Sequence, residues 1–471
     1  MDLTLVKSKI NLSDYDYKKD IENRLLMSTF STQDLSILEE ILYSPLSVSM
    51  YQIATNLSLT DDELVPSLKK LSQTGLFEID NFNIIINKQM RKYYEFQFLK
   101  FNSQFKPDLE FSQNLLKKVP IHVLPFWYSI SKTSDNIFYS IIEKYLKTPS
   151  IFQKHIEDVK SEHELLKDII DELYKSKELK LKAKDLIEKH QITRNELEEI
   201  LLILEFNFTA CLSYEKNNDH YEEIITPFYE WNEYLNHLKQ SDIPPITNLE
   251  INIKRDDDFG FVKDIVTILN MCQKTPLNIV IKNNKPSLTE DVISNICQTN
   301  NISDNYQSLN SYFSEIIERI CLIKFAEINN DKLFIKETAK EWLSMDIETK
   351  ALHLYRHPLN HLTSISLSAL YNEDAIREAE KSITRAFHKG WVYFDDFVKA
   401  SLAPLTKEQN ILLKQIGTHW TYNIPNYSED EKNIIKSAIF ETLFEAGIVK
   451  IGKLDNKDCF CITKFGHHLF E

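Results

Sequence analysis

Glycine is scarce in this chain, with 7 residues in 471. Phosphate-binding loops and flexible linkers both depend on glycine, so the sequence offers little room for either. Cysteine is sparse too: the 6 cysteines form no CxxC pair of the kind that binds zinc or carries out disulfide exchange. Most of them lie in apolar runs, a position typical of buried thiols in a reducing compartment.

Long apolar segments are also missing. No uninterrupted apolar run reaches the about 20 residues that a membrane-spanning helix needs. Residues 1–9 lack the apolar stretch of a signal peptide. We therefore expect a soluble cytoplasmic protein with no membrane partner.

Positive charge is in deficit. The chain carries 55 Lys and Arg residues against 70 Asp and Glu residues, a formal net charge of -15. Such a chain repels nucleic acid at long range, so any DNA contact must come from a local basic strip. The overall charge favours protein partners.

The chain does contain one recurring unit. Four times an apolar, strand-like run leads into a helix that begins with an aromatic or basic cluster, at residues 85–88, 224–227, 333–336 and 461–464. In at least three cases an amphipathic helix and a polar turn come first. This order matches the back half of a winged helix: recognition helix, wing hairpin and linking helix. The predicted fold is therefore mainly α with small β wings, a tandem array of winged-helix domains, which is typical of binding proteins.

The length suits about three or four domains. Prolines at positions 107, 120 and 125 indicate a linker region, and Pro244 with Pro245 marks a later boundary. The predicted domains are winged helix 1 at 1–105, a linker region at 106–150, winged helix 2 at 151–240, winged helix 3 at 241–360 and winged helix 4 at 361–471.

Local patterns predict several element ends. Thr60 is expected to cap a helix over 61–74, which Gly75 ends, and strands at 76–79 and 84–87 then form the first wing. Thr193 and Ser428 are expected to cap later helices, and Asp395 to cap a helix over 397–402. The last domain is predicted to hold an insertion at 403–427, and residues 277–281 to form a single strand.

Short motifs over residues 259–471 carry a family resemblance. They are TPLNIVI (275–281), LTED (288–291), AKEWL (339–343), GWVYFDDF (390–397), FEAGIV (444–449) and ITKFG (462–466). This half resembles the helicase-associated winged-helix proteins of bacteria, whose repeats are similar to the N-terminal region of XPB-type helicases. The resemblance implies a non-catalytic accessory that acts beside an XPB-like motor or its DNA. The chain differs from the family in having His467 after Gly466, where Arg is usual, and in its insertion.

Two patterns imitate nucleotide and metal sites. Residues 447–453 have the spacing GxxxxGK, but Leu454 follows where a Mg²⁺-binding hydroxyl belongs, and the apolar alternation predicts a wing strand. His353, His357 and His361 recur every four residues, but Pro358 interrupts that helix and no carboxylate or Cys completes a metal shell. We predict exposed histidines there, and no cofactor or metal site in the chain.

Nuclease chemistry is a separate alternative. Asp256, Asp257 and Asp258 could hold a divalent metal, although a solvated acidic loop is the simpler interpretation. Cys459 and Cys461 are expected to be a core pair on one strand face. The predicted protein is therefore not an enzyme, with a metal-dependent nuclease kept as an alternative.

The third helix of each unit argues against duplex readout, because it begins with carboxylates, at 61–63, 196–199 and 429–431, where major-groove contacts need Arg, Lys, Asn or Gln. Basic residues gather instead near the wings and linking helices. The candidate DNA contacts are Lys88, Arg91, Lys92, Lys450 and Lys453. A solvated face of mixed charge is the simpler interpretation of these residues.

We therefore predict a non-catalytic tandem winged-helix adaptor. It binds a protein partner, an XPB-like helicase or another DNA-processing complex, and it makes at most weak non-specific DNA contact. Candidate partner-binding anchors are the aromatic residues Phe126, Trp127, Tyr128 and Trp391, unless core packing explains them. A DNA-binding transcriptional regulator that uses basic wings is the main alternative.

Overall fold

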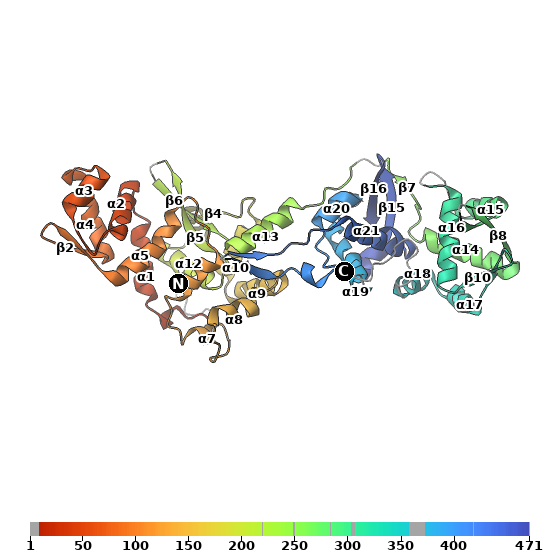
Figure 1. Ribbon diagram of the computed structural model, residues 1–471, viewed down its shortest axis with the longest axis horizontal. Helices are drawn as coiled ribbons and strands as arrows, with labels where there is room; N and C mark the ends of the chain where they lie inside the picture. The colour runs from red at the N-terminus through yellow and green to blue at the C-terminus, as the bar shows by residue number, and fades with distance from the viewer. Residues whose placement is uncertain are drawn as a thin grey trace. The chain divides into compact units, whose positions relative to one another are not determined.

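The computed structural model describes residues 9–218, 220–247, 250–282, 284–302, 307–357, 373–417 and 419–470. These residues form mainly helices, with small antiparallel sheets (Figure 1). The chain divides into two compact units. Unit 1 is Met1–Asn236 with Leu412–Tyr422, and unit 2 is His237–Ile411 with Asn423–Glu471. The predicted domain boundary at 360/361 lies outside the described residues.

Unit 1 begins with α1 (Tyr17–Met27), which precedes a module of helices and a hairpin that we call the first module. Its elements are α2 (Thr32–Tyr43), β1 (Ser47–Ser49), α3 (Met50–Leu57), α4 (Asp61–Leu71), β2 (Phe77–Asp80), β3 (Asn83–Ile86) and α5 (Lys88–Phe98). The strands pair in the order β1-β3-β2. Ile41, Leu68 and Ile84 are fully buried in its core. The predicted helix, hairpin and following helix are confirmed here.

The start of α4 follows the predicted cap. The Glu63 carboxylate accepts hydrogen bonds from the Thr60 backbone N–H at 2.9 Å and from the Thr60 hydroxyl at 2.8 Å. This pairing satisfies a backbone donor that the helix leaves without a partner. Gly75 follows with φ of +67°, a left-handed conformation that glycine adopts without strain, and turns the chain into β2.

Residues 106–150, predicted as a linker region, contain three helices: α6 (Leu109–Leu116), α7 (Leu124–Trp127) and α8 (Ile137–Tyr145). Buried apolar side chains such as Leu115 and Ile141 anchor them within unit 1. The three prolines therefore mark helix starts in a folded segment, because Pro107 and Pro120 precede α6 and α7 and Pro125 lies in the first turn of α7.

The second module of unit 1 is built around one buried helix. Its elements are α9 (Pro149–Glu162), α10 (Glu164–Lys175), β4 (Leu181–Lys182), α11 (Ala183–His190), α12 (Arg194–Phe206), β5 (Cys211–Asn217), β6 (His220–Thr226) and α13 (Tyr229–Gln240). Thr193 caps α12 as predicted, and it forms a capping box with Glu196. Eleven of the thirteen α12 residues are apolar or glutamate, and every residue from Ile200 to Phe206 is buried. Burial on all sides is typical of a central core helix.

Part of the predicted insertion at 403–427 is a hairpin that belongs to unit 1. It consists of β13 (Leu413–Ile416) and β14 (His419–Tyr422). The Leu413 backbone N–H donates to the Lys147 carbonyl at 2.8 Å. The Tyr422 hydroxyl donates to the Leu146 carbonyl at 2.7 Å, and its ring lies against Trp231. The chain therefore leaves unit 2 to complete unit 1 and then returns.

Unit 2 first forms helices around a four-stranded sheet of order β10-β11-β8-β9. The elements are β7 (Asn252–Ile253), α14 (Gly260–Lys274), β8 (Leu277–Lys282), β9 (Lys285–Leu288), α15 (Glu290–Asn300), α16 (Leu309–Leu322), β10 (Ala326–Asn329), β11 (Lys332–Ile335), α17 (Glu337–Ser344) and α18 (Ile347–Arg356). Where one strand was predicted at 277–281, the structure has the hairpin β8–β9. The short strand β9 contains Pro286, and a proline argues against a strand in the sequence, so β9 was not predicted.

The rest of unit 2 forms a second sheet, of order β12-β16-β15-β7. Its elements are α19 (Glu373–Lys381), β12 (Val392–Tyr393), α20 (Phe394–Ala400), α21 (Glu429–Ser437), the π-helical η8 (Ala438–Leu443), β15 (Val449–Leu454), β16 (Lys457–Ile462) and α22 (Lys464–Phe470). Ser428 and Glu431 cap α21 as predicted. The predicted Asp395 cap is wrong, because α20 already begins at Phe394 and Asp395 lies inside its first turn.

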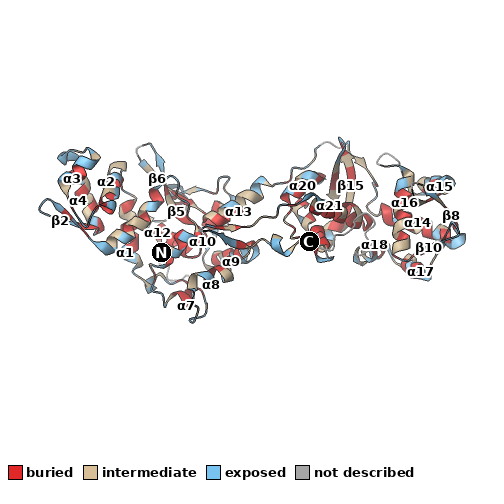
Figure 2. Cartoon of the chain, in the orientation of Figure 1, coloured by how far each residue is buried: buried red, intermediate tan, exposed pale blue. Residues whose placement is uncertain are grey.

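The two parts of unit 2 share one hydrophobic core, which runs from Ile243 to Phe460. Strand β7 pairs with β15 at Gly452, where a β-carbon would lie 2.6 Å from Ile251. Only glycine allows this close approach of the two strands. Figure 2 shows buried residues on the inner faces of the helices and exposed residues on the hairpin near β2. None of the described helices has both the length and the apolar character needed to span a bilayer.

Candidate functional site

Exposed apolar side chains concentrate on the first module. Sixteen large apolar residues are exposed among the described residues, and seven of them lie between positions 43 and 85. The seven are Tyr43, Leu46, Tyr51, Val65, Ile79, Phe82 and Ile85. Scattered apolar exposure is ordinary, but a concentration in one small module is typical of an interaction surface.

The most exposed members of this set lie where α3 meets the β2–β3 hairpin. The Met50 backbone N–H donates to the Phe82 carbonyl at 2.9 Å, which holds the start of α3 beside the hairpin turn. Tyr51, the next residue of α3, is 80% exposed, and Phe82 is 79% exposed. Asn81 adopts φ of +55°, which asparagine tolerates in tight hairpin turns. The turn therefore presents an aromatic ring at its tip.

Strand register gives the hairpin one acidic and apolar face. Ile84 and Ile86 are buried, so side chains alternate and Ile85 points away from the core. Glu78 lies directly opposite Ile85 in the ladder, and Asp80 lies two residues further along the same strand. Directly opposed side chains lie close together. We call Tyr51, Glu78, Asp80, Phe82 and Ile85 the hairpin patch.

The surroundings of the patch are strongly acidic. Residues 29–87 contain eight Asp and Glu residues and two Lys residues, a net charge of -6. One of the two, Lys70, is committed internally, since its ammonium lies 2.7 Å from the Asp34 carboxylate and also donates to the Thr29 carbonyl. Asp61 and Asp62 are exposed at the start of α4. An anionic ligand such as DNA would be repelled by this surface.

The predicted DNA contacts of unit 1 lie on α5. Lys88 and Lys92 are exposed one helical turn apart, and neither forms an ion pair within the described ranges. Arg91 is half-buried, and its Nε lies 3.1 Å from the Glu95 carboxylate. Two lysines of the predicted set are therefore available to a ligand on this helix.

The predicted DNA contacts of unit 2 lie on β15. The Lys450 ammonium lies 3.1 Å from Asp258 and 3.3 Å from Asp256, and it also donates to the Asp256 carbonyl. Partial burial opposes the charge, but the two carboxylates raise the pKa of Lys450. Lys453 is half-buried in the same strand, opposite Asp458. The acidic loop therefore pairs with Lys450, and its Asp256 side chain is 88% exposed, as expected of a solvated loop.

The predicted aromatic anchors divide between surface and core. Phe126 is 63% exposed, with the Lys132 ammonium 4.3 Å from its ring centre. Trp127 and Tyr128 are buried. The Trp127 indole N–H donates a hydrogen bond to the Asp14 carboxylate at 2.8 Å, and the Tyr128 hydroxyl donates to the Phe206 carbonyl at 2.6 Å. Burial makes these two core residues, which corrects their prediction as partner anchors.

Trp391 is the predicted anchor of unit 2, and it is half-buried. Its carbonyl accepts a hydrogen bond from the Ile246 N–H at 2.7 Å. Its ring lies 3.3 Å from the position that a β-carbon on Gly452 would occupy. The tryptophan therefore packs over the β7–β15 junction, with only part of its ring available to a partner.

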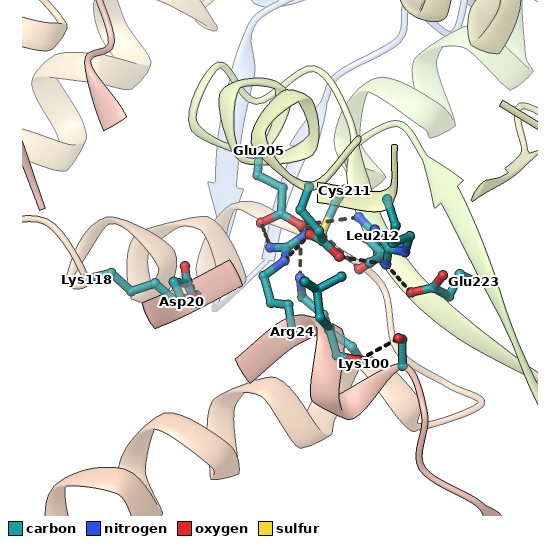
Figure 3. A network of polar contacts seen from close by, with 12 residues as sticks. Asp20, Arg24, Lys100, Lys118, Glu205, Cys211, Leu212 and Glu223 are labelled. Atoms are coloured by element: carbon teal, nitrogen blue, oxygen red, sulfur yellow. Dashed lines mark hydrogen bonds and ion pairs between the residues drawn. The ribbon is translucent and has the colours of Figure 1, made fainter. Parts of the chain in front are cut away.

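A buried network of charges, missed by the sequence analysis, lies at the centre of unit 1 (Figure 3). Arg24 of α1 contacts Glu198 at 2.5 Å and Glu205 at 2.7 Å, both on α12. Lys100 also contacts Glu205, at 2.9 Å, and Lys118 contacts Asp20 at 2.8 Å. Burial alone would raise the pKa of Glu205, but Arg24 and Lys100 hold it well below its usual range.

This network corrects the interpretation of α12. Glu198 was grouped with the first-turn carboxylates that would repel phosphates, but it is fully buried and paired within the unit. Glu198 and Glu205 are seven residues apart, which places both on one face of the helix. Two glutamates at this spacing in an otherwise apolar helix are the feature of the sequence that could have predicted the network. A network closed to solvent stabilises the fold and offers no ligand a place to bind.

A polar depression of about 460 Å³ lies at the second hairpin. It is lined by residues of α1, β4, α11 and the β5–β6 hairpin, including Lys182, Lys184 and His220. Lys182 is held by Glu222 at 2.8 Å, and Glu223 also lines the depression. Its charges are mixed, so it favours neither an anion nor a cation.

In the described part of the chain, no group of three or more His, Cys, Asp or Glu side chains is arranged to hold a metal ion. His353 lies on α18 with its ring 6.0 Å from that of Phe325, His357 follows the helix, and His361 lies outside the described residues. Cys459 is buried and Cys461 half-buried on β16, both as free thiols.

The chain was compared with known proteins. No family model matches the sequence, and a search of curated proteins found no match.

Proposed function

We propose that this chain is a non-catalytic adaptor, made of winged-helix modules, that binds a protein partner in the cytoplasm. The modular part of the proposal is supported by four occurrences of helix, hairpin and helix in that order. They are α4 with β2–β3 and α5, α12 with β5–β6 and α13, α16 with β10–β11 and α17, and η8 with β15–β16 and α22. This is the order of recognition helix, wing and linking helix.

One observation carries the partner-binding part of the proposal. Seven of the sixteen exposed large apolar side chains in the described ranges lie on the first module, and the two most exposed, Tyr51 and Phe82, adjoin one hairpin turn. Aromatic residues exposed in this way are the usual anchors of protein interfaces. The resemblance of residues 259–471 to helicase-associated proteins suggests an XPB-like helicase or another DNA-processing complex as the partner.

Weak, non-specific DNA contact is the second candidate function. Lys88 and Lys92 support it, because they are exposed one turn apart on α5. Two lysines neutralise about two phosphates, so such binding would be weak and would fall about tenfold as salt is raised from about 50 to about 200 mM. The acidic first module, with its net charge of -6, limits this contact to the base of the hairpin.

The test is affinity capture from cells that express the protein, followed by reconstitution with the purified partner. We expect one saturable complex with a protein partner that survives nuclease treatment. Binding to a labelled DNA duplex and to single strands is measured in parallel at low and physiological salt. No saturable protein complex, together with sub-micromolar DNA binding lost on reversing Lys88, Arg91 and Lys92, would replace the adaptor by the DNA-binding regulator.

A further inference from the structure

The hairpin patch has a chemistry that restricts what can bind it. Its apolar members, Tyr51, Phe82 and Ile85, are exposed, and they lie on two elements joined by the hydrogen bond from Met50 to Phe82. Exposed aromatic rings at a hairpin tip gain stability only when another surface covers them. A partner that covers the patch with apolar side chains would therefore gain binding free energy.

The charges of the patch are all of one sign. Glu78 lies opposite Ile85, Asp80 lies on the same strand, and both carboxylates are exposed without an ion pair among the described residues. The nearest lysine in the sequence, Lys88, follows the far end of β3, away from the turn at Asn81 and Phe82. Carboxylates beside an apolar surface attract cationic side chains and repel phosphates, which excludes nucleic acid and anionic lipid from this site.

We infer that the hairpin patch docks a protein segment that carries lysine or arginine next to aliphatic or aromatic side chains. The inference rests on the proposed adaptor function and names the chemistry of its partner. The long alkyl part of a lysine or arginine side chain can cover Ile85 while its charged end reaches Glu78. Charge complementarity of this kind speeds association and selects against acidic partners.

The test uses synthetic peptides with the full-length protein. The probe is a labelled 15-residue peptide of alternating lysine and leucine blocks, and its two controls replace every lysine by glutamate or every leucine by serine. Binding is measured by fluorescence anisotropy at physiological salt. The patch variants are Tyr51→Ser with Phe82→Ser, and Glu78→Lys with Asp80→Lys.

Matched control variants carry the same changes elsewhere. Ile121→Ser with Ile416→Ser removes two equally exposed apolar residues, and Asp135→Lys with Asp168→Lys changes the net charge by the same amount. We expect the lysine–leucine peptide to bind the wild type and both controls, and each patch variant to bind it at least tenfold more weakly. Neither control peptide should bind.

Three outcomes would overturn the inference. Equal binding by the wild type and the patch variants would show that the peptide binds elsewhere on this acidic chain. No binding by the wild type would exclude a cationic, apolar ligand. Self-association of the wild type that the patch variants abolish, measured by sedimentation, would make the occupant a second copy of this chain.

The inference and the proposed function can fail separately. If a partner identified by affinity capture binds the patch variants as tightly as the wild type, the adaptor function stands and the hairpin patch is not its docking site. If no protein partner forms a saturable complex but the peptide result holds, the patch has the inferred chemistry and the adaptor proposal fails.

Discussion

At the scale of single residues, the centre of unit 1 is held by buried charges. Arg24 and Lys100 share Glu205, and their side chains are at most 2% exposed. Three segments far apart in the sequence meet at this glutamate: α1, the turn after α5, and α12. Removing one member of such a group leaves the others charged, buried and without a partner, which is strongly destabilising.

Glu205→Gln is therefore expected to lower the free energy of unfolding of unit 1 by about 3–5 kcal/mol at neutral pH. Urea unfolding, monitored by hydrogen exchange of the α12 amides, measures this loss of stability. Because the pKa of Glu205 is lowered by folding, its contribution is present above the unfolded pKa and is lost as the pH falls towards the folded pKa. The difference between variant and wild type should shrink in acid.

Glu22→Gln is the control for this prediction. Glu22 forms an exposed pair with Lys19 at 3.4 Å, which contributes at most about 1 kcal/mol. An equal loss from Glu22→Gln and Glu205→Gln would contradict the structural role of the network.

Glu230 predicts the opposite pH dependence. Burial raises its pKa to about 8, although its Oε1 accepts a hydrogen bond from the Leu109 N–H at 2.9 Å. Protonated Glu230 contributes its full stability at pH values below the unfolded pKa of about 4.3. This stability is lost as the pH rises through the folded pKa, at up to about 1.4 kcal/mol per pH unit. Glu230→Gln, neutral at every pH, should gain on the wild type between pH 5 and pH 8.

Thermal unfolding of unit 1 at pH 5 and pH 8 measures this gain. Glu233→Gln, an exposed position on the same helix, is the control and should change little at either pH. A pH-independent difference between Glu230→Gln and the wild type would show that Glu230 is ionised throughout this range in the folded protein.

At the scale of elements, the hairpin β13–β14 is the least local part of unit 1. Its residues follow those of unit 1 by more than 170 positions, yet Tyr422 is buried against Trp231 and bonded to Leu146. Its aromatic ring also lies 5.6 Å from that of Tyr234. The hairpin therefore completes the core around α13.

Tyr422→Ala should lower the stability of unit 1 by about 3–5 kcal/mol, because it removes a buried ring and its hydrogen bond. Hydrogen exchange in α8 and α13 should increase, while exchange in α14 and α16 of unit 2 stays as it was. Ile416→Ser on the same hairpin is exposed and should have little effect. Loosening of α14 by Tyr422→Ala would assign the hairpin to unit 2.

At the scale of the whole molecule, the chain has two compact units with separate cores. Unit 1 is centred on α12 and its charge network, and unit 2 on a single apolar core that includes Ile265 and Ile439. Proteins with separate cores commonly lose two-state unfolding, because each core can melt by itself.

We therefore expect two thermal transitions in calorimetry. Ile265→Ala, in the fully buried centre of α14, should lower the free energy of unfolding of unit 2 by about 2–5 kcal/mol and so lower the temperature of its transition. Glu205→Gln should lower the transition temperature of unit 1. A single transition that both variants shift equally would mean that the units unfold as one.

Charge is also distributed unevenly over the whole chain. Of the net charge of -15, the 59 residues from 29 to 87 contribute -6. The hairpin patch lies within that segment, so the exposed aromatic residues Tyr51 and Phe82 coincide with a local excess of carboxylates. This coincidence, and not the total charge, is what points to a cationic partner.

The sequence by itself determined the elements whose causes are local. The capping boxes at Thr60, Thr193 and Ser428 each join residues three positions apart, and all three were predicted. Such patterns are complete within a few residues, so no distant contact is needed to read them.

Only the tertiary structure decided which side chains are free. Phe126 and Trp127 are neighbours in the sequence, yet Phe126 is exposed and Trp127 is buried, because Trp127 packs into the core of unit 1 and donates a hydrogen bond to Asp14. Lys450 meets Asp256 across 194 positions, and the hairpin at Leu413 joins a unit that the chain had left. Burial and pairing depend on residues distant in the chain, and for that reason no local pattern encodes them.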